Sequence, residues 1–465
     1  MSQGPVLMWF RRDLRLADNP ALLAAAADGR PVVPLFVLDE TPGPRAPGAA
    51  TLWWLDKSLA ALGASLEAMG SKLILRRGEA AKVVAELAAE TGAGKVVWSR
   101  AYDPATVARD TALKAELKAR GLEAESFNGS LLIEPWTLKT GGGTPYRVFT
   151  PFWRAARPAI GEPEPEPAPE RLAAPDAWPR SDRLADWGLH PRRPDWSGGF
   201  SGWRPGEAGA QALLSRFVDD HLDHYALGRD RPAMDGSSRL SPHLSWGEIS
   251  PRQAYAATGA SEKFRSELGW REFNHHLLFD QPDIAAVNVD HRFDTMEWRA
   301  DEAGFEAWSR GRTGLPWVDA GMRQLWSEGF MHNRVRMAAA SFLIKHLLID
   351  WRRGERWFWD TLVDADPANN PGNWQWVAGS GRDAAPFFRV FNPVSQGERF
   401  DPEGDYVRRW VPELARLPAK YIHAPWTAPP LALAGAGLNL GRDYPLPIVD
   451  LSEGRNRALA AFRSL

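Results

Sequence analysis

Residues 6–38 read VLMWFRRDLRLADNPALLAAAADGRPVVPLFVL, and their pattern predicts the architecture of the first part of the chain. Two short apolar runs, Val6–Phe10 and Val32–Leu38, enclose an alanine- and leucine-rich segment at Ala21–Ala27. Continuous apolar runs of this length are typical of strands buried on both faces, and the segment between them favours a helix. A strand, a helix and a second strand in this order predict a parallel βαβ unit.

The same alternation continues to about residue 130. Further strands are expected at Leu73–Leu75, Val96–Ser99 and Leu122–Phe127, with helices at Leu52–Met69, Ala80–Thr91 and Ala105–Arg120. Residues 1–130 are therefore expected to form an α/β domain with a mostly parallel, Rossmann-like sheet. No Gly-x-Gly-x-x-Gly sequence follows the first strand and no Walker A loop is present, so a standard dinucleotide or ATP site is not expected here.

After residue 130 the composition changes twice. Ile160–Pro169 reads IGEPEPEPAP, and proline with acidic residues dominates to about Asp195, which favours extended chain without a core of its own. Residues 131–200 are expected to be an interdomain linker. From residue 201 the pattern is helical, with Ser-Pro pairs at Ser241 and Ser250 marking helix starts and a long helical run at Val335–Trp351. Residues 201–465 are expected to form an all-α domain.

Composition narrows the functional classes. The chain has no cysteine, which excludes disulfides, thiolate metal sites and a cysteine nucleophile. The N-terminus lacks the pattern of a signal peptide and no apolar run approaches the length of a membrane helix, so we expect a soluble, cytoplasmic protein. A monomer is a separate expectation. Residues 201–465 carry 31 Lys+Arg and 34 Asp+Glu, a net charge of −3, so a nucleic-acid site must be a local basic patch. The 23 tryptophans indicate either a large aromatic core or redox and stacking roles.

The first motif that could carry chemistry is DADPANNPGNWQW at residues 364–376. A calcium loop is excluded, because the loop glycine and the final glutamate are missing. The two carboxylates, Asp364 and Asp366, could form an acid/base pair, or the segment could bind a polar heterocycle, with carboxylates accepting from ring N–H groups and amides donating to ring atoms.

Three further groups of residues could carry chemistry, and each also has a structural interpretation. On a helix, Glu267, Trp270, Arg271 and Asn274 share one face, as either a surface ion pair beside a half-buried tryptophan or a stacking wall edged by a carboxylate. His332 has no second histidine four residues away, so a structural role is favoured over a metal site. The hydroxyls of the run Ser237–Ser241 could hold phosphate at a helix start, although serine clusters are usually loops.

Long motifs in this order resemble the photolyase/cryptochrome family, and the likeness spans nearly the whole chain. The segments are WFRRDLRLADNPAL (9–22), SSRLSPHLSWGEISPRQ (237–253), WREF (270–273), TGLPWVDAGMRQLW (313–326), MHNRVRM (331–337), DADPANNPGNWQWVAGSG (364–381) and FFRVFNPVSQGERFDPEGDYVRRWVPEL (387–414). The resemblance implies an α/β domain joined by a long linker to a helical FAD-binding domain. It also implies light-driven repair of cyclobutane pyrimidine dimers in DNA by an electron from reduced FAD.

The family's functional positions carry over to this sequence residue by residue. FAD contacts are implied for Tyr225, Ser237, Ser238, Arg239, Leu240, Ser241, Phe264, Arg271, Asn333, Arg336, Asp364, Asp366 and Asn370. Asp364 is expected to pair with Arg336, Asp366 to bind the flavin ring, and Asn370 to face flavin N5. At Phe264 many relatives have tryptophan. The pocket for the flipped dimer is implied for Glu267, Trp270, Asn333, Met337 and Trp376, with Asn370 also among the catalytic positions.

Two further sets follow from the resemblance. Trp374, Trp351 and Trp298 match a tryptophan relay that carries electrons to the flavin, and Arg229, Arg271, Arg334 and Arg389 match DNA phosphate contacts. Enzymes that repair 6-4 photoproducts have histidines where this chain has Asn333 and Met337, so dimer repair is favoured. No metal is expected. A folate antenna, a deazaflavin antenna or none remain open, as do strand preference and a cryptochrome-like photoreceptor without repair activity.

Overall fold

The computed structural model describes residues 4–259 and 261–465, which form two compact units. Unit 1 comprises the chain up to Trp196 together with Trp203–Leu222 and Ser238–Pro282. Unit 2 comprises Ser197–Gly202, Asp223–Ser237 and Asp283–Leu465. Sequence domains bounded at residues 130 and 200 stay a prediction, since the compact units divide the chain at other points.

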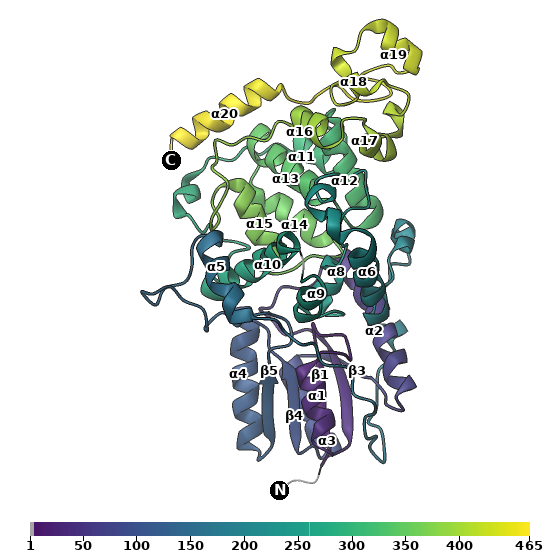
Figure 1. Ribbon diagram of the computed structural model, residues 1–465, viewed down its shortest axis with the longest axis vertical. Coiled ribbons are helices and arrows are strands. Elements are labelled where there is room, and N and C mark those ends of the chain that lie inside the picture. The colour runs from purple at the N-terminus through teal and green to yellow at the C-terminus, as the bar shows by residue number, and fades with distance from the viewer. Residues whose placement is uncertain (1–3, 260) are drawn as a thin grey trace. The chain divides into compact units, whose positions relative to one another are not determined.

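Unit 1 is built on a five-stranded parallel sheet with the strand order β3-β2-β1-β4-β5 (Figure 1). The strands are β1 (Val6–Phe10), β2 (Val32–Asp39), β3 (Ile74–Gly78), β4 (Lys95–Ser99) and β5 (Glu123–Phe127). The helices of this unit are α1 (Pro20–Ala27), α2 (Ala49–Ala68), α3 (Ala80–Thr91), α4 (Pro104–Ala119), α5 (Phe149–Ile160), α6 (Glu207–Asp220), α8 (Ser241–Trp246), α9 (Pro251–Ala257) and α10 (Glu262–Asp280). The predicted α/β class and parallel sheet are confirmed.

The central strand β1 is buried along its whole length, as its continuous apolar sequence requires. Leu7 and Trp9 belong to a core that also contains buried residues of α3 and α4, whereas α1 packs on β1 and β4. Two of these helices begin at side-chain caps: Asn19 Oδ1 accepts from the backbone N–H of Leu22 at the start of α1, and Asp103 Oδ1 accepts from that of Thr106 at the start of α4.

The proline-rich segment follows the surface of unit 1. The backbone N–H of Val32 donates to the carbonyl of Ala173 at 2.8 Å, and that of Asp182 donates to the carbonyl of Leu75 at 2.8 Å. The predicted linker contains a complete helix, α5. This helix packs closely on α10, since a Cβ on Gly269 would lie 2.5 Å from the Trp153 ring. The connector therefore includes part of the core of unit 1.

Unit 2 consists of helices and loops and contains no strand among its described residues, which confirms the predicted all-α class. Its helices are α7 (Tyr225–Gly228), α11 (Glu302–Ser309), α12 (Pro316–Glu328), α13 (Asn333–Ser341), α14 (Trp351–Thr361), α15 (Asn369–Ala378), α16 (Pro393–Phe400), α17 (Asp405–Trp410), α18 (Ala419–Ile422), α19 (Pro430–Ala436) and α20 (Leu451–Arg463). Across the residues that the structure describes, no helix is long and apolar enough to cross a membrane.

The predicted single helix at Val335–Trp351 is wrong. Helix α13 ends at Ser341 and continues as a π-helical segment, Phe342–His346, after which Leu348 adopts a left-handed conformation with φ 56°. This backbone stops the helix, and α14 starts anew at Trp351 with Asp350 Oδ1 accepting from the N–H of Arg352 at 2.9 Å. Apolar composition alone carries no signal for such a break.

The two predicted helix starts differ. Ser250 caps α9 through a reciprocal pair of hydrogen bonds with Gln253, as expected. Ser241 does not act as a cap, because it is the first residue of α8 and Leu240 occupies the cap position. Its hydroxyl is consequently not needed to cap this helix.

Candidate functional site

The segment 364–376 surrounds the start of α15 in unit 2. Asp366 Oδ1 accepts from the N–H groups of Ala368 at 2.9 Å and Asn369 at 2.7 Å, and from the Asn369 side chain at 2.9 Å. Asp366 thus holds this turn in place. Among the described residues, no group of three or more His, Cys, Asp or Glu side chains is arranged to hold a metal ion.

Arg336 and Asp364 form the ion pair that the family resemblance implies. The guanidinium donates through Nη1 to Oδ1 at 3.1 Å and through Nη2 to Oδ2 at 2.8 Å, while Nε donates to the carbonyl of Met331 at 2.6 Å. The Asp364 side chain is 5% exposed. A two-pronged, buried pair of this kind fixes both side chains.

Asn370, on the first turn of α15, has its amide orientation set by Glu355 on α14. Its Nδ2 donates to the Glu355 carbonyl at 3.0 Å and to Glu355 Oε1 at 2.7 Å, and both side chains are buried. Because the amide nitrogen faces Glu355, the amide oxygen is directed elsewhere as an acceptor. Sequence reasoning missed Glu355, which stands in a helical run with no motif of its own.

The three tryptophans predicted to form an electron relay lie on adjoining segments of unit 2. Trp374 packs against Gly354, one turn after Trp351 on α14, so closely that a Cβ there would lie 2.2 Å from the Trp374 ring. Trp351 is fully buried and its Nε1 donates to Asn288 Oδ1 at 2.9 Å. Arg299, the neighbour of Trp298, donates its N–H to the carbonyl of Leu348 at 2.8 Å. The structure therefore brings Trp298 into the vicinity of the residues that precede Trp351.

Helix α13 presents Asn333 and Met337 one turn apart. Asn333 is exposed, Met337 is half-buried, and Nδ2 of the first lies 3.9 Å from Sδ of the second. His332 accepts from the N–H of Arg334 at 3.3 Å, and burial, together with nearby Arg336, lowers its pKa to about 4. A neutral, capping histidine fits the structural role expected from the sequence.

Asp230 organises two of the predicted phosphate-contacting arginines in unit 2. Arg334 donates to both of its carboxylate oxygens, at 2.8 and 3.0 Å, and Arg229 Nε lies 3.7 Å away. Although burial acts to raise it, the pKa of Asp230 is lowered, mainly by Arg334. Arg229 also lies over the ring of Tyr225, which is buried, and Ser237 is half-buried.

On α10 in unit 1, Trp270 stacks flat on Phe149 of α5, with ring centroids 3.9 Å apart and an interplanar angle of 8°. Glu267 pairs with Lys263 one turn earlier at 3.0 Å and remains 28% exposed. Asn274, which the sequence placed on the same face, is buried. Phe149 was missed because it lies in the segment assigned to the linker.

Arg271 belongs to a buried ion pair. Its Nη1 donates to Glu272 Oε1 at 2.9 Å, and Glu272 Oε2 accepts from the N–H groups of Leu132 at 2.8 Å and Ile133 at 3.2 Å. Glu272 is fully buried, and this burial raises its pKa to about 7 against the opposing effect of Arg271.

The serine-rich turn before α8 has a constrained backbone. Arg239 is left-handed with φ 53° and its guanidinium lies 4.3 Å from the centre of the Trp203 ring. Ser238 Oγ accepts from the N–H of Leu240 at 3.4 Å. Phe264, the position where tryptophan is common in relatives, packs its ring against Phe217 with centroids 4.8 Å apart.

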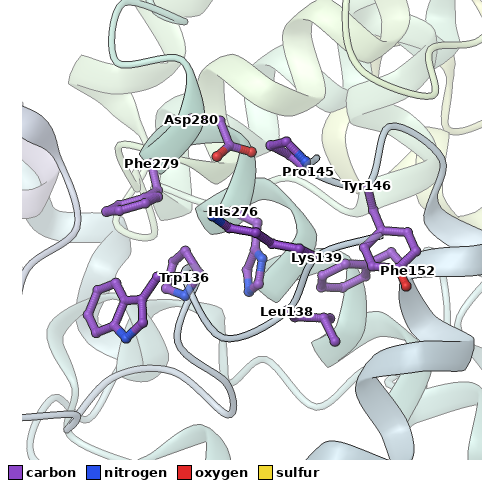
Figure 2. Close-up of a pocket in the computed structure, with 10 residues that line it drawn as sticks. Trp136, Leu138, Lys139, Pro145, Tyr146, Phe152, His276, Phe279 and Asp280 are labelled. Atoms are coloured by element: carbon purple, nitrogen blue, oxygen red, sulfur yellow. The ribbon is translucent and has the colours of Figure 1, made fainter. Parts of the chain in front are cut away.

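Unit 1 also contains a cavity of about 100 Å³ that no sequence motif indicated (Figure 2). Its lining comes from the connector and from the end of α10: Pro135, Trp136, Leu138, Lys139, Pro145, Tyr146, Phe152, His276, Phe279 and Asp280. Trp136 is 43% exposed and its ring centroid lies 5.7 Å from that of Phe279. The lining thus combines aromatic faces with one amine and one carboxylate.

Comparison with known proteins places these residues in context. Residues 6–170 match the family model described as DNA photolyase, and residues 264–464 match the FAD binding domain of DNA photolyase. A deoxyribodipyrimidine photo-lyase from Agrobacterium fabrum is 54% identical over 100% of this chain and 99% of its own length. Cryptochrome-2 from Arabidopsis thaliana is 38% identical over 97% of this chain and 77% of its own length. The crystal structure of a bacterial class III photolyase from Agrobacterium tumefaciens has a TM-score of 0.96 at 54% identity, covering 100% of this chain and 98% of the other.

Proposed function

Because this chain belongs to the photolyase/cryptochrome family, we propose that it repairs cyclobutane pyrimidine dimers in DNA under light, with reduced FAD as its cofactor. The observation that carries this proposal is the orientation of Asn370. Its amide nitrogen is committed to Glu355, so its oxygen is available to accept from the N–H that reduced flavin carries at N5. A site that stabilises the reduced flavin is what dimer repair requires.

The residues present fit FAD. Arg336, held by Asp364, supplies positive charge, and Asp366 adds a carboxylate at the turn that leads into α15. We assign the phosphates and ribitol to Tyr225, Ser237, Ser238, Arg239, Leu240 and Ser241, and further flavin contacts to Phe264, Arg271 and Asn333. When bound, the flavin supplies the electron that opens the dimer.

We assign dimer recognition to side chains that stay accessible. Trp270 and Trp376 offer aromatic faces for stacking, which contributes about 1–3 kcal/mol per base. Glu267 and Asn333 are exposed or half-exposed and carry hydrogen-bonding groups for the pyrimidine carbonyls and N–H groups, and Met337 supplies an apolar contact. A damaged base pair is weakly stacked, which lowers the cost of flipping the dimer out of the duplex.

The remaining assignments concern DNA, electrons and light. Arg229, Arg271, Arg334 and Arg389 are assigned to phosphates, and Trp374, Trp351 and Trp298 to an electron relay from the surface. The cavity beside Trp136, at about 100 Å³, is too small for a folate or deazaflavin antenna, so we assign no antenna to it. We further propose that the protein acts as a monomer in the cytoplasm.

The test is direct repair. Purified, photoreduced protein is mixed with a dimer-containing oligothymidine, and recovery of thymine absorbance is followed under blue light and in the dark. Recovery that requires both light and reduced flavin is expected, and Glu267→Gln is expected to lower the yield per photon. An intact reduced flavin without recovery would instead identify a photoreceptor.

A further inference from the structure

A fully buried lysine in unit 2 has no role in the contacts assigned above. Lys345 lies on the π-helical segment Phe342–His346 and its side chain is removed from solvent. Its Nζ donates to the carbonyl of Arg389 at 3.0 Å and lies 5.2 Å from the centre of the Phe387 ring. Lysine is almost never buried completely, because its ammonium loses its hydration. Burial, with a further contribution from Arg389, lowers the pKa of Lys345 to about 7.

The π-helical turn explains how Lys345 reaches this place. The N–H of Leu347 donates to the carbonyl of Phe342 at 3.1 Å, five residues back, and the extra residue in this turn changes the direction of the side chains that follow α13. Ser341, at the end of α13, contacts the same loop as Lys345, since its Oγ accepts from the N–H of Phe391 at 3.3 Å. One short segment thus binds the loop at Arg389 and again at Phe391.

The loop at residues 380–391 has a buried underside and an exposed tip. Its N-terminal half is held by the N–H of Ala385, which donates to the carbonyl of Trp376 at 3.1 Å. Phe387 is buried against Phe462, with ring centroids 5.0 Å apart. The tip is different: Phe388 is 62% exposed and Arg389 is exposed beside it. An exposed aromatic side chain next to an exposed cation is typical of a surface that contacts nucleic acid.

The geometry points to Lys345 as a positioning residue that fixes the main chain of the 380–391 loop so that Arg389 can contact a DNA phosphate. This inference rests on the proposed function, because it uses the assignment of Arg389 to DNA. Lys345 itself is too deeply buried to touch DNA and acts only through the loop. This positioning role would explain why a lysine stands here, although a methionine side chain would fill the same buried space.

A double-mutant cycle tests whether Lys345 affects DNA binding through Arg389. Dissociation constants for a dimer-containing duplex are measured in the dark, at fixed pH and salt, for the flavin-loaded wild type, Lys345→Met, Arg389→Met and the double variant. We expect Arg389→Met to weaken binding about tenfold and Lys345→Met about threefold. The double variant should bind no more than about twofold more weakly than Arg389→Met, because both changes remove the same contact. A double variant that binds about thirtyfold more weakly than the wild type, which is the product of the two single effects, would overturn the inference.

Two controls keep the test decisive. Lys420→Met removes an exposed lysine of the same unit and should leave the dissociation constant unchanged, which separates loop positioning from loss of charge. If Lys345→Met does not fold, Ser341→Ala removes the second anchor of the loop and should weaken binding in the same way, again without effect once Arg389 is methionine. Hydrogen exchange of Ala385–Phe391 should be faster in both anchor variants, and unchanged exchange there would contradict the proposed anchoring.

The outcomes also separate this inference from the proposed function. A wild type that does not prefer dimer-containing DNA would refute the function itself. A wild type that binds dimers, weakened by Arg389→Met but not by Lys345→Met, would leave the function intact and refute only the role of Lys345.

Discussion

Glu272 in unit 1 and Lys345 in unit 2 are both removed from solvent, and both have a pKa of about 7. Each also adjoins an arginine that we assign to DNA. The difference is in how the arginine is held. Glu272 Oε1 accepts a hydrogen bond from the guanidinium of Arg271 at 2.9 Å. Lys345 Nζ instead donates to the main-chain carbonyl of Arg389 at 3.0 Å and does not hold its side chain.

Because of this difference, we expect Arg271 to contribute to folding stability and Arg389 mainly to DNA recognition. Arg271 neutralises a buried opposite charge and its side chain is only 12% exposed, so it contributes to the fold as well as to any ligand. Arg389 disfavours a proton on the lysine beneath it, and it is an exposed residue whose guanidinium lies over the Phe391 ring. Replacing the two arginines should therefore have very different consequences for folding.

The largest effect is expected for Arg271→Met. Removing one partner of a buried ion pair leaves the Glu272 carboxylate without its cation, which costs about 3–5 kcal/mol of unfolding free energy. Urea unfolding at pH 8 measures this loss. Arg353→Met is the matched control, because it breaks an ion pair with Glu302, whose side chain is 77% exposed, and should cost less than about 1 kcal/mol. Equal losses in the two variants would show that Arg271 is no more structural than a surface residue.

The second effect concerns pH and Lys345. Its pKa in the folded chain, about 7, lies below the ordinary value of 10.5, so between these values the unfolded chain holds a proton that the folded chain lacks. Wild-type unfolding free energy should then rise with pH by up to about 1.4 kcal/mol per unit. The rise from pH 7 to 9 is about 2 kcal/mol, because the folded lysine is still half protonated at pH 7. Lys345→Met lacks this contribution. The unfolding free energy of the wild type, minus that of the variant, should therefore increase by this amount from pH 7 to 9. A difference independent of pH would contradict a neutral, buried Lys345.

Glu272 should show the opposite slope at lower pH. Its folded pKa of about 7 exceeds the ordinary 4.5, so over this interval the folded chain binds a proton that the unfolded chain has lost. Wild-type stability should therefore be greatest below pH 4.5 with respect to this group and fall by about 2 kcal/mol between pH 5 and 6.5. Glu272→Gln should remove that fall, as followed by urea midpoints at both pH values. If the variant retains the full fall, another group is responsible.

The smallest effect is expected for the folding stability of Arg389→Met, which should change by less than about 0.5 kcal/mol because the guanidinium lies at the surface. The same urea titration that detects the loss in Arg271→Met provides the measurement. A loss comparable with that of Arg271→Met would mean that the 380–391 loop depends on the arginine head and not on its backbone anchor.

Much of the fold could be predicted because its signals are local. The apolar runs at Val6–Phe10 and Val32–Leu38 indicated buried parallel strands, and Ser250 followed by Pro251 indicated a helix start. The break between α13 and α14 could not be predicted, since Leu348 has no preference for a left-handed backbone and adopts it only because the surrounding structure requires it.

The candidate site was predictable to the extent that its residues lie within long motifs. Asp364 and Arg336 were paired correctly in advance, and Asn333 and Met337 do lie one turn apart. Their partners were not found: Glu355 orients Asn370 from a different helix, and Phe149 stacks on Trp270 from the connector. Such contacts depend on tertiary packing, and single-sequence patterns do not encode them.

The central assignment, in which Asn370 faces the flavin and Trp270 on α10 stacks on the dimer, can be tested with the Trp270→Ala variant. The measurement is dimer repair per bound flavin under blue light, with the flavin-to-protein ratio determined on the same samples. The variant should keep a wild-type flavin content and lose most of its repair. Normal repair, or loss of flavin in step with repair, would contradict the assignment of Trp270 to the dimer.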